Sequence, residues 1–378
     1  MAGFAEALGW VLALLAALGC AYTLAAAWLV GGYRAGPVAP AEPLPVNVLK
    51  PLHGTEPRLL DNLRTLLRQE YAAPVEILFG TARADDPALA VVEQLRAEFP
   101  SADIKVVINP ARHGSNAKMS NVINIADAAR HPLIVLADSD VAWPADTLAR
   151  LNAALVEPGV GLASCLHVGR GDAGFWSVLG AMDISYRFLP SIVIGIATGL
   201  AQPTLGPTLA LRRETLAAVG GFRAFADVLA DDYETGRAVR ALGLRTVVPH
   251  FTITHSGDEA DAGTLRRHEL RWTRTIKGID PWGFAGSMVT HPVPLALGAV
   301  LLLGKPLLPL LGAALLLRWL LMARIDAVTA SRAGPFWLLP LRDCLSGALF
   351  VATFFVDNVM WRGTRYSVAS DGRIFEKN

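Results

Sequence analysis

The chain has 378 residues, of which 53% are hydrophobic and 18% are charged, and its formal net charge is +1. Its mean hydropathy of +0.39 is too high for an ordinary soluble domain, whereas the charged fraction is too high for a bundle of membrane helices alone. The near-neutral charge gives no indication of a nucleic-acid partner. Cys20, Cys165 and Cys344 form no C-x-x-C pair, so neither a disulfide framework nor a zinc site is predicted.

The apolar excess lies at the two ends of the chain. The first stretch has one acid and no base before Arg34, and it is long enough to cross a hydrocarbon core, which needs ~20 residues. A cleaved signal peptide would begin with basic residues and have a shorter apolar core, so residues 1–33 are predicted to form a retained anchor. The positive-inside rule then places the middle of the chain in the cytoplasm. Residues 291–361 are predicted to hold the C-terminal membrane helices, with three crossings in all, followed by a cytoplasmic tail over 362–378.

Residues 45–290 have an ordinary globular composition and are predicted to form one catalytic domain. Strands are predicted at 46–49, 75–79, 104–108 and 133–137, with helices at 56–70, 88–99 and 117–129 between them. This alternation predicts parallel βαβ units with helices on both faces, in which ligands bind beyond the carboxyl ends of the strands. No glycine-rich phosphate motif follows the first strand, so the charge of a phosphate ligand needs another partner.

Two segments leave their relation to the membrane open. Residues 188–211 contain no charge, but three prolines and three glycines are unusual in one lipid-facing helix. A crossing there would also put Asp138 and Asp232 on opposite sides of the membrane. Residues 188–206 are therefore predicted to be interfacial and to lead into a core strand at 208–211. Prolines interrupt residues 292–323, which form either one kinked span or a tight hairpin.

Two carboxylates, Asp138 and Asp140, directly follow the predicted strand at 133–137. Hard divalent cations such as Mg²⁺ and Mn²⁺ prefer carboxylate oxygens, and they bind substrate phosphates while keeping several waters. Such a cation offsets the charge that develops on a leaving diphosphate. A plain turn is the alternative, since Asp and Ser both favour turns, and this motif alone does not decide between the two.

Two later clusters suggest chemistry of the same kind. Asp231, Asp232 and Glu234 open a predicted helix, where interaction with the helix dipole accounts well for one acid and less well for three. A carboxylate there could act as a general base. Arg271 and Trp272 lie in a basic segment that could equally be a solvated face or a patch for anionic lipids. Arg binds phosphate in bidentate fashion, and Trp offers a flat apolar face to an acceptor.

In this order the motifs resemble those of membrane glycosyltransferases of the ceramide glucosyltransferase family, and most of all its bacterial hopanoid-biosynthesis members. That family's pattern is three separated aspartates followed by (Gln/Arg)-x-x-Arg-Trp, and here ARADDPAL, LADSD, LADDYE and HELRW supply it. VLKPLHGTEP, RHGSNAKMSN, GPTLALRRE and WRGTRY extend the similarity over nearly the whole chain. Two departures stand out: His268 replaces the first residue of the last motif, and Arg83-Ala84 precede the first acidic pair where relatives often carry another acid.

The resemblance implies a GT-A fold, which is an α/β Rossmann-like domain with a mostly parallel sheet, together with transmembrane helices and interfacial segments at 188–206 and 262–290. It implies that Asp86 contacts the uridine and that Asp138 and Asp140 hold Mg²⁺ or Mn²⁺. Asp232 would take the proton from the attacking hydroxyl, with inversion at the anomeric carbon.

Further roles implied by the resemblance fall on four residues. Arg271 would stabilise the leaving diphosphate, and Trp272 would shape the acceptor site. Lys118 would assist at the nucleotide, with a solvated helix start as the alternative. His268 would line the donor or acceptor site or serve in packing, and its effect in place of Gln or Arg stays open.

The activity that this resemblance implies is transfer of glucose or N-acetylglucosamine from a UDP-sugar to the hydroxyl of a membrane lipid, either ceramide or a hopanoid. The protein would be an integral protein of the bacterial inner membrane, because a lipid tail leaves the bilayer at a cost of ~0.8 kcal/mol per CH₂ group. The alternatives are a polyprenyl-phosphate or polysaccharide sugar transferase, and a non-catalytic scaffold that binds nucleotide sugars or lipids. The sequence distinguishes neither the sugar, the acceptor nor the metal.

Overall fold

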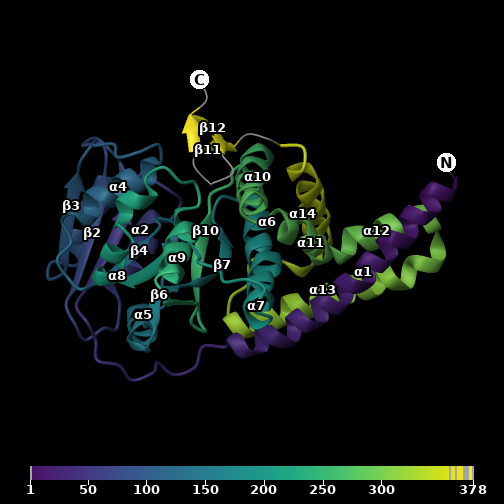
Figure 1. Ribbon diagram of the computed structural model, residues 1–378, viewed down its shortest axis with the longest axis horizontal. Helices are drawn as coiled ribbons and strands as arrows, with labels where there is room; N and C mark the ends of the chain where they lie inside the picture. The colour runs from purple at the N-terminus through teal and green to yellow at the C-terminus, as the bar shows by residue number, and fades with distance from the viewer. Residues whose placement is uncertain (1, 357–358, 362–363, 369–373, 377–378) are drawn as a thin grey trace. The chain divides into compact units, whose positions relative to one another are not determined.

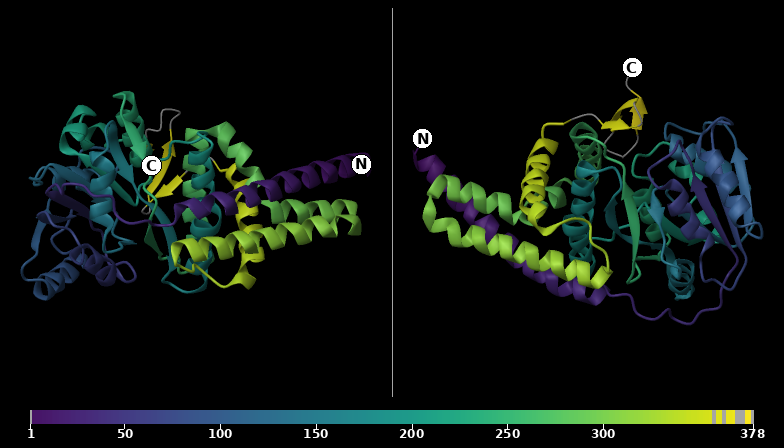
Figure 2. Two further views of the ribbon diagram at one scale, coloured as in Figure 1. Left: turned by 90° about the horizontal axis from the view of Figure 1, so that it is seen from below. Right: turned by 180° about the vertical axis from the view of Figure 1, so that it is seen from behind.

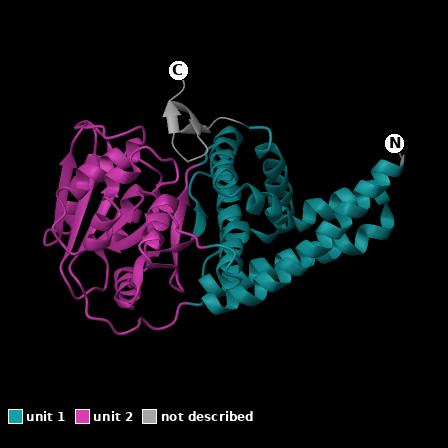
Figure 3. Cartoon of the chain, in the orientation of Figure 1, with its two compact units in different colours: residues 1–34, 168–201, 259–365 teal, residues 35–167, 202–258, 366–378 magenta. Residues whose placement is uncertain are grey.

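The structure is a computed structural model that describes residues 2–356, 359–361, 364–368 and 374–376, with side chains described from Gly3 to Val356. The chain divides into two compact units, shown in Figure 3, and each is described by itself. Unit 1 comprises residues 1–34, 168–201 and 259–365, and unit 2 comprises residues 35–167, 202–258 and 366–378. About half of the predicted cytoplasmic tail, residues 362–363, 369–373 and 377–378, lies outside the described residues.

Unit 2 is built on a seven-stranded sheet with the order β3-β2-β1-β4-β8-β6-β9. Strands β1, β2, β3 and β4 are mutually parallel, whereas β8 runs antiparallel to both β4 and β6. The predicted, mostly parallel α/β sheet is confirmed, and its first four strands lie within two residues of their predicted positions. The strands are β1 (Val46–Pro51), β2 (Val75–Thr81), β3 (Asp103–Ile108), β4 (Leu133–Ala137), β6 (Val160–Ser164), β8 (Thr208–Arg212) and β9 (Arg245–Val247).

Helices cover both faces of this sheet because its strands are apolar on both sides (Figure 1). Val48 packs against helices of one face and the next residue, Leu49, against those of the other. The first face carries α2 (Leu59–Leu67), α3 (Ala88–Glu98) and α5 (Thr147–Val156), and the second carries α4 (Ala117–Ala126), α8 (Arg213–Ala218) and α9 (Asp231–Ala241).

Helix α2 and two short strands, β5 and β10, differ from the prediction. Helix α2 is shorter than the predicted 56–70, since Pro57 and a left-handed Arg58 precede its first turn. A short antiparallel pair, β5 (Val141–Ala142) with β10 (Thr252–Gly257), was not predicted. This pair matters for the site because it sets His255 opposite Val141, directly after the Asp138–Asp140 loop.

Unit 1 is mainly helical, and most of its helices are apolar. They are α1 (Ala2–Val30), α6 (Phe175–Asp183), α7 (Leu189–Ala197), α10 (Ala262–Ile279), α11 (Pro281–Gly286), α12 (Pro292–Leu303), α13 (Leu308–Thr329) and α14 (Leu339–Thr353). A π-helical turn, Ile184–Phe188, joins α6 to α7. Four stretches are long and apolar enough to cross a membrane, namely Gly3–Tyr33, Phe175–Ala197, Lys305–Thr329 and Phe336–Thr353, and the helix pair around His291 is bent by 70°. The candidates thus outnumber the three predicted crossings.

Helices α1, α12 and α13 pack lengthwise, as Figure 2 shows. Gly9 of α1 lies against Leu303 at the end of α12, and Gly31 lies against Arg324 near the end of α13. Helices α12 and α13 therefore run in opposite directions along α1. Of the two alternatives for residues 292–323, the structure has the hairpin.

The stretch Phe175–Ala197 is long and apolar enough to cross a membrane, but strand pairing argues against a single crossing there. Strand β4 precedes it, β8 follows it, and the two are hydrogen-bonded neighbours in one sheet. Both ends of the intervening chain, all of which is described, therefore lie on the same side of any membrane. Two charged residues, Asp183 and Arg187, also lie within the stretch. These facts argue against a single crossing by Phe175–Ala197, whereas an interfacial position for residues 188–206 stays a prediction.

We expect this topology to appear in the labelling of single cysteines in a background without Cys20, Cys165 and Cys344. A cysteine at Leu200, which is 85% exposed just after α7, should react with a membrane-impermeant maleimide from the same side as one at Arg83 in unit 2. A cysteine at Lys305, in the α12–α13 turn, should react from the opposite side. Reaction of the Leu200 and Arg83 positions from opposite sides would show that Phe175–Ala197 crosses after all.

Candidate functional site

Three charged side chains meet where β4 ends in unit 2. The Lys118 ammonium, from the first turn of α4, lies 2.7 Å from Oδ1 of Asp138 and 3.8 Å from Oδ2 of Asp231. Burial alone would lower the pKa of Lys118, but the charges of Asp138 and Asp231 outweigh it and raise that pKa. Lys118 is therefore part of a carboxylate cluster and not a solvated helix start.

The same cluster includes Asp232, in the first turn of α9. Its Oδ1 accepts a hydrogen bond of 2.8 Å from the backbone N–H of Tyr233. A Cβ at Gly206 would lie 2.8 Å from its Oδ2, so glycine there leaves room beside this oxygen. Burial and the adjacent Asp231 charge raise the pKa of Asp232 to about 6. A carboxylate with this pKa is a stronger base than an exposed aspartate and is still ionised at neutral pH.

Two residues that the sequence did not single out hold the Asp138–Asp140 loop. Lys50, at the end of β1 and fully buried, donates a hydrogen bond to the main-chain carbonyl of Asp138. The Ser139 hydroxyl donates to Oε1 of Glu56 at 2.8 Å, and Oε2 of Glu56 is buried with no hydrogen-bond partner among the described residues. Burial and the Asp140 charge raise the pKa of Glu56 to about 7. The signal available in the sequence for Lys50 is a lysine near the end of a strand that is apolar apart from Asn47.

Asp140 contacts His255, a residue that the sequence analysis does not single out. Its Oδ2 lies 3.3 Å from Nε2 of His255, which the β5–β10 pairing places there. The ring of His167 lies 5.8 Å from that of His255, and burial together with His255 lowers the pKa of His167 to about 3. No local motif marks His255, because the pairing that positions it joins segments more than a hundred residues apart.

Asp86 lies at the carboxyl end of β2 and is buried. Its carboxylate accepts hydrogen bonds from the backbone N–H groups of Gly54 and Ala88, both at 3.0 Å, and from the Thr81 hydroxyl at 3.3 Å. It thereby ties the loop after β1 to the loop after β2. The preceding Asp85 is exposed and pairs with Arg83. Contact between Asp86 and a uridine stays a prediction.

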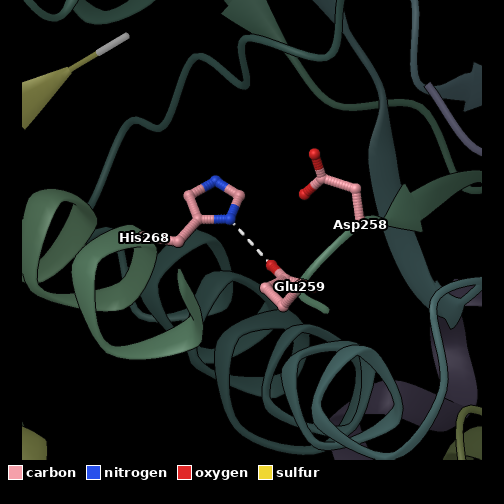
Figure 4. A group of neighbouring side chains, drawn as sticks. All are labelled: Asp258, Glu259 and His268. Carbon is pink, nitrogen blue, oxygen red and sulfur yellow. Dashed lines mark hydrogen bonds and ion pairs between the residues drawn. The ribbon is translucent and has the colours of Figure 1, made fainter. Parts of the chain in front are cut away.

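The remaining predicted residues lie on α10, in unit 1. Nδ1 of His268 lies 2.7 Å from Oε1 of Glu259, as Figure 4 shows, and the His268 ring lies 4.3 Å from that of Trp272. Arg271 and Trp272 are both partly exposed. His268 is thus engaged in a packed pair within its own unit. That α10 shares one pocket with the carboxylates of unit 2 stays a prediction.

The donor set in unit 2 fits a divalent cation. Five carboxyl groups interact electrostatically with two ammonium groups, those of Lys50 and Lys118. The carboxyl groups belong to Glu56, Asp138, Asp140, Asp231 and Asp232. With all seven groups ionised, five negative and two positive charges leave a formal charge of −3. Burial is the main cause of the raised pKa values of Glu56 and Asp232, and the neighbouring carboxylates add to it. Carboxylate oxygens are the ligands that Mg²⁺ and Mn²⁺ prefer, so Asp138 and Asp140 suit the predicted metal.

Comparisons with known proteins agree with the predicted resemblance. Ceramide glucosyltransferase 1 of Caenorhabditis elegans is 22% identical over 352 residues, which cover 89% of this chain and 74% of that protein. Ceramide glucosyltransferase 3 of the same organism is 22% identical over 230 residues, covering 61% and 50% of the two chains. Among solved structures, the mannosyltransferase PcManGT from Pyrobaculum calidifontis, in complex with GDP-Man and Mn²⁺, shares the fold, with a TM-score of 0.55, 21% identity and coverage of 92% of this chain and 98% of that one.

A sequence match to one protein family extends over almost the entire chain. Residues 10–374 match the family described as Glycosyl transferase family 21. The match includes the loop after β4 that carries Asp138, the helix α9 that carries Asp232 and the helix α10 that carries Arg271. The chain therefore belongs to glycosyl transferase family 21.

Proposed function

We propose that the protein is an inverting glycosyltransferase that moves glucose or N-acetylglucosamine from a UDP-sugar to the hydroxyl of a membrane lipid, either ceramide or a hopanoid. The observation that supports this most is the cluster of Lys118, Asp138, Asp231 and Asp232 at the carboxyl end of the sheet. Ligands of such sheets bind at this end, and here one carboxylate has the pKa of a general base.

Asp232 takes the proton of the attacking hydroxyl. Its half-buried carboxylate is ionised at neutral pH and has one oxygen held by the Tyr233 N–H, which leaves the other, beside Gly206, for the hydroxyl. A single base that assists one direct displacement gives inversion at the anomeric carbon. Arg271 stabilises the leaving diphosphate through its planar guanidinium, and Trp272 packs against the acceptor.

Asp138 and Asp140 hold Mg²⁺ or Mn²⁺ in this proposal, and the bound cation supplies charge compensation for the leaving diphosphate. Lys118 shares Asp138 with that site and supplies one further positive charge near the diphosphate. Lys50 and Glu56 hold the loop that carries both aspartates, Lys50 through the Asp138 carbonyl and Glu56 through the Ser139 hydroxyl. Asp86 fixes the neighbouring loop near the uridine.

The apolar helices explain how a soluble donor meets an insoluble acceptor. The hydroxyl of a ceramide or hopanoid lies at the level of the lipid headgroups, and moving the tail into water is costly. We propose that α1, α12 and α13 anchor an integral protein of the bacterial inner membrane whose unit 2 lies in the cytoplasm. Arg34, four residues after the end of α1, supports this orientation by the positive-inside rule.

Mass spectrometry of lipid products tests the proposal. The purified full-length protein is incubated with ceramide or bacteriohopanetetrol, each combined with UDP-glucose or UDP-N-acetylglucosamine and with Mg²⁺ or Mn²⁺. At least one combination should yield a lipid heavier by one sugar residue. Product formed only on a polyprenyl phosphate would favour that alternative, and the absence of metal-dependent UDP release with any lipid extract would favour a scaffold.

The pH dependence of the reaction should report Asp232. Because the base must be ionised, and because burial raises the pKa of Asp232 to about 6, kcat/KM should be constant above roughly pH 7 and fall as the pH drops through 6. The measurement is initial transfer rate from pH 5 to 8 at saturating metal. A profile that stays flat down to pH 5 would show that no group with this pKa acts as the base.

A further inference from the structure

One face of α10 in unit 1 is bound to α14 by polar contacts spaced one helical turn apart. Glu269, Thr273 and Lys277 follow each other at intervals of four residues, so they share a face. Oγ1 of Thr273 lies 2.7 Å from Oγ1 of Thr353, and the Lys277 ammonium donates to the carbonyl of the same Thr353 at 3.3 Å. The strongest contact of this face is made by Glu269.

Glu269 forms a bidentate ion pair with Arg342 of α14. The two guanidinium nitrogens of Arg342 lie 2.8 and 2.6 Å from the two carboxylate oxygens of Glu269. The side chains of Arg342 and Glu269 are only 2% and 7% exposed. A planar, bidentate pair of this kind fixes the relative orientation of its partners as well as their distance.

Arg342 also connects this pair to α6. It lies 3.0 Å from Oδ1 of Asp183, whose carboxylate also pairs with Arg187 one turn later. The Ser346 hydroxyl accepts from Nε of Arg342 at 3.0 Å and donates to Asp183 at 2.7 Å. Two acids and two arginines therefore form a network of balanced charge that joins α6, α10 and α14.

Such a network adds little stability over an apolar core, since desolvation offsets most of the attraction between buried charges. Its geometric consequence is larger, because α10 can rotate or slide only if the bidentate pair breaks. At ~100° per residue, Arg271 lies on the side of α10 opposite to Glu269. Any rotation of α10 would therefore displace the Arg271 guanidinium and the Trp272 ring.

We propose that Arg342 is a positioning residue for the transfer reaction. By binding Glu269 and Asp183 together, it fixes the rotation of α10 and thereby the direction in which Arg271 and Trp272 are presented. This inference rests on the proposed function, in which those two residues contact the diphosphate and the acceptor. A displacement of about 1 Å in a catalytic group costs on the order of 100-fold in rate.

The test compares three variants of the full-length protein. Arg342→Met leaves Glu269 buried without its partner and should lower the melting temperature strongly. Arg342→Met combined with Glu269→Gln removes both charges of the pair, leaves Asp183 with Arg187, and should recover most of that loss. Its kcat should nevertheless stay about 100-fold below wild type.

The matched control removes another buried bidentate pair of unit 1 that does not involve α10. Arg318 and Asp343, on α13 and α14, are joined by two bonds of 2.8 Å. Arg318→Met with Asp343→Asn should have a kcat within threefold of wild type. The inference is overturned if the Arg342–Glu269 double variant regains wild-type kcat along with its stability, or if the control loses as much activity.

A second readout separates this inference from the proposed function. Hydrogen–deuterium exchange of Ala262–Ile279 should be faster in the Arg342–Glu269 double variant than in the control. If the wild-type protein forms no glycolipid, the proposed function fails, yet faster exchange still supports the network as the device that orders α10. Equal exchange in the two double variants overturns it whatever the activity.

Discussion

Replacing Asp232 by Asn should lower kcat by about 10³-fold with little change in the affinity for the UDP-sugar, because general-base catalysis contributes roughly 10²–10⁴-fold. The amide keeps the size and the hydrogen bond to the Tyr233 N–H but cannot accept the proton of the acceptor hydroxyl. The measurement is steady-state transfer to the lipid identified by mass spectrometry. The acid limb of the pH profile should disappear in the variant as well.

The matched control lies on the same helix. Glu234→Gln removes an acid of the first turn of α9 that pairs with the exposed Arg237, and its activity should stay within about twofold of wild type. If Asp232→Asn turned over as fast as this control, the acceptor would have to bring its own ionised nucleophile. A polyprenyl phosphate would then be the better acceptor.

The second large effect is expected at the metal site. Asp138→Asn should reduce transfer by at least about 10²-fold and raise the Mn²⁺ concentration needed for half-maximal activity, because the loss of one carboxylate weakens both the hold on the metal and the compensation of diphosphate charge. Activity measured across a Mn²⁺ titration, at fixed UDP-sugar and acceptor, reports both quantities.

The control for this variant is Asp127→Asn, on the surface of the same unit, where Asp127 is 69% exposed and pairs only loosely with Arg223 at 3.5 Å. It should show the wild-type metal requirement. Should Asp138→Asn also show the wild-type requirement, the cluster at the end of β4 is held together by Lys118 alone and does not depend on a divalent cation.

The sequence predicts well those strands and helices that follow one another directly along the chain. The first four strands are short apolar runs separated by helices of regular spacing, and each apolar residue such as Val48 or Leu49 finds helices on its own side of the sheet. Strands β5 and β9 escape prediction because they span only two and three residues, and β6 and β10 escape it because small or polar residues interrupt their apolar runs. Their positions depend on pairing with strands far away in the chain.

The site divides in the same way. Asp138, Asp140 and Asp232 were found because each lies directly after a strand or at the start of a helix. The sequence does not mark Lys50, Glu56 or His255 as site residues, because each could equally be an ordinary structural residue. Only tertiary contacts bring them to the loop that carries Asp138 and Asp140. From the sequence, Lys118 could belong to the site or to a solvated helix start. Its distance of 2.7 Å to Asp138 decides for the site.

Unit 1 shows a limit of hydropathy as a guide. Phe175–Ala197 and Phe336–Thr353 are long and apolar enough to span a membrane, yet they carry Asp183 and Arg342, which bind each other inside the unit. Composition predicts that such segments avoid water. It does not say whether they face lipid or other helices, which depends on pairing between helices.

The central claim, that Asp232 is the single base of an inverting transfer, is tested most directly by the anomeric configuration of the glycolipid that the wild-type protein makes. The product of an α-configured UDP-sugar is isolated, and its anomeric proton coupling is measured by NMR. A β-linked sugar is the predicted result. An α-linked sugar would contradict the account, because retention requires a different arrangement of catalytic groups from the one proposed around Asp232.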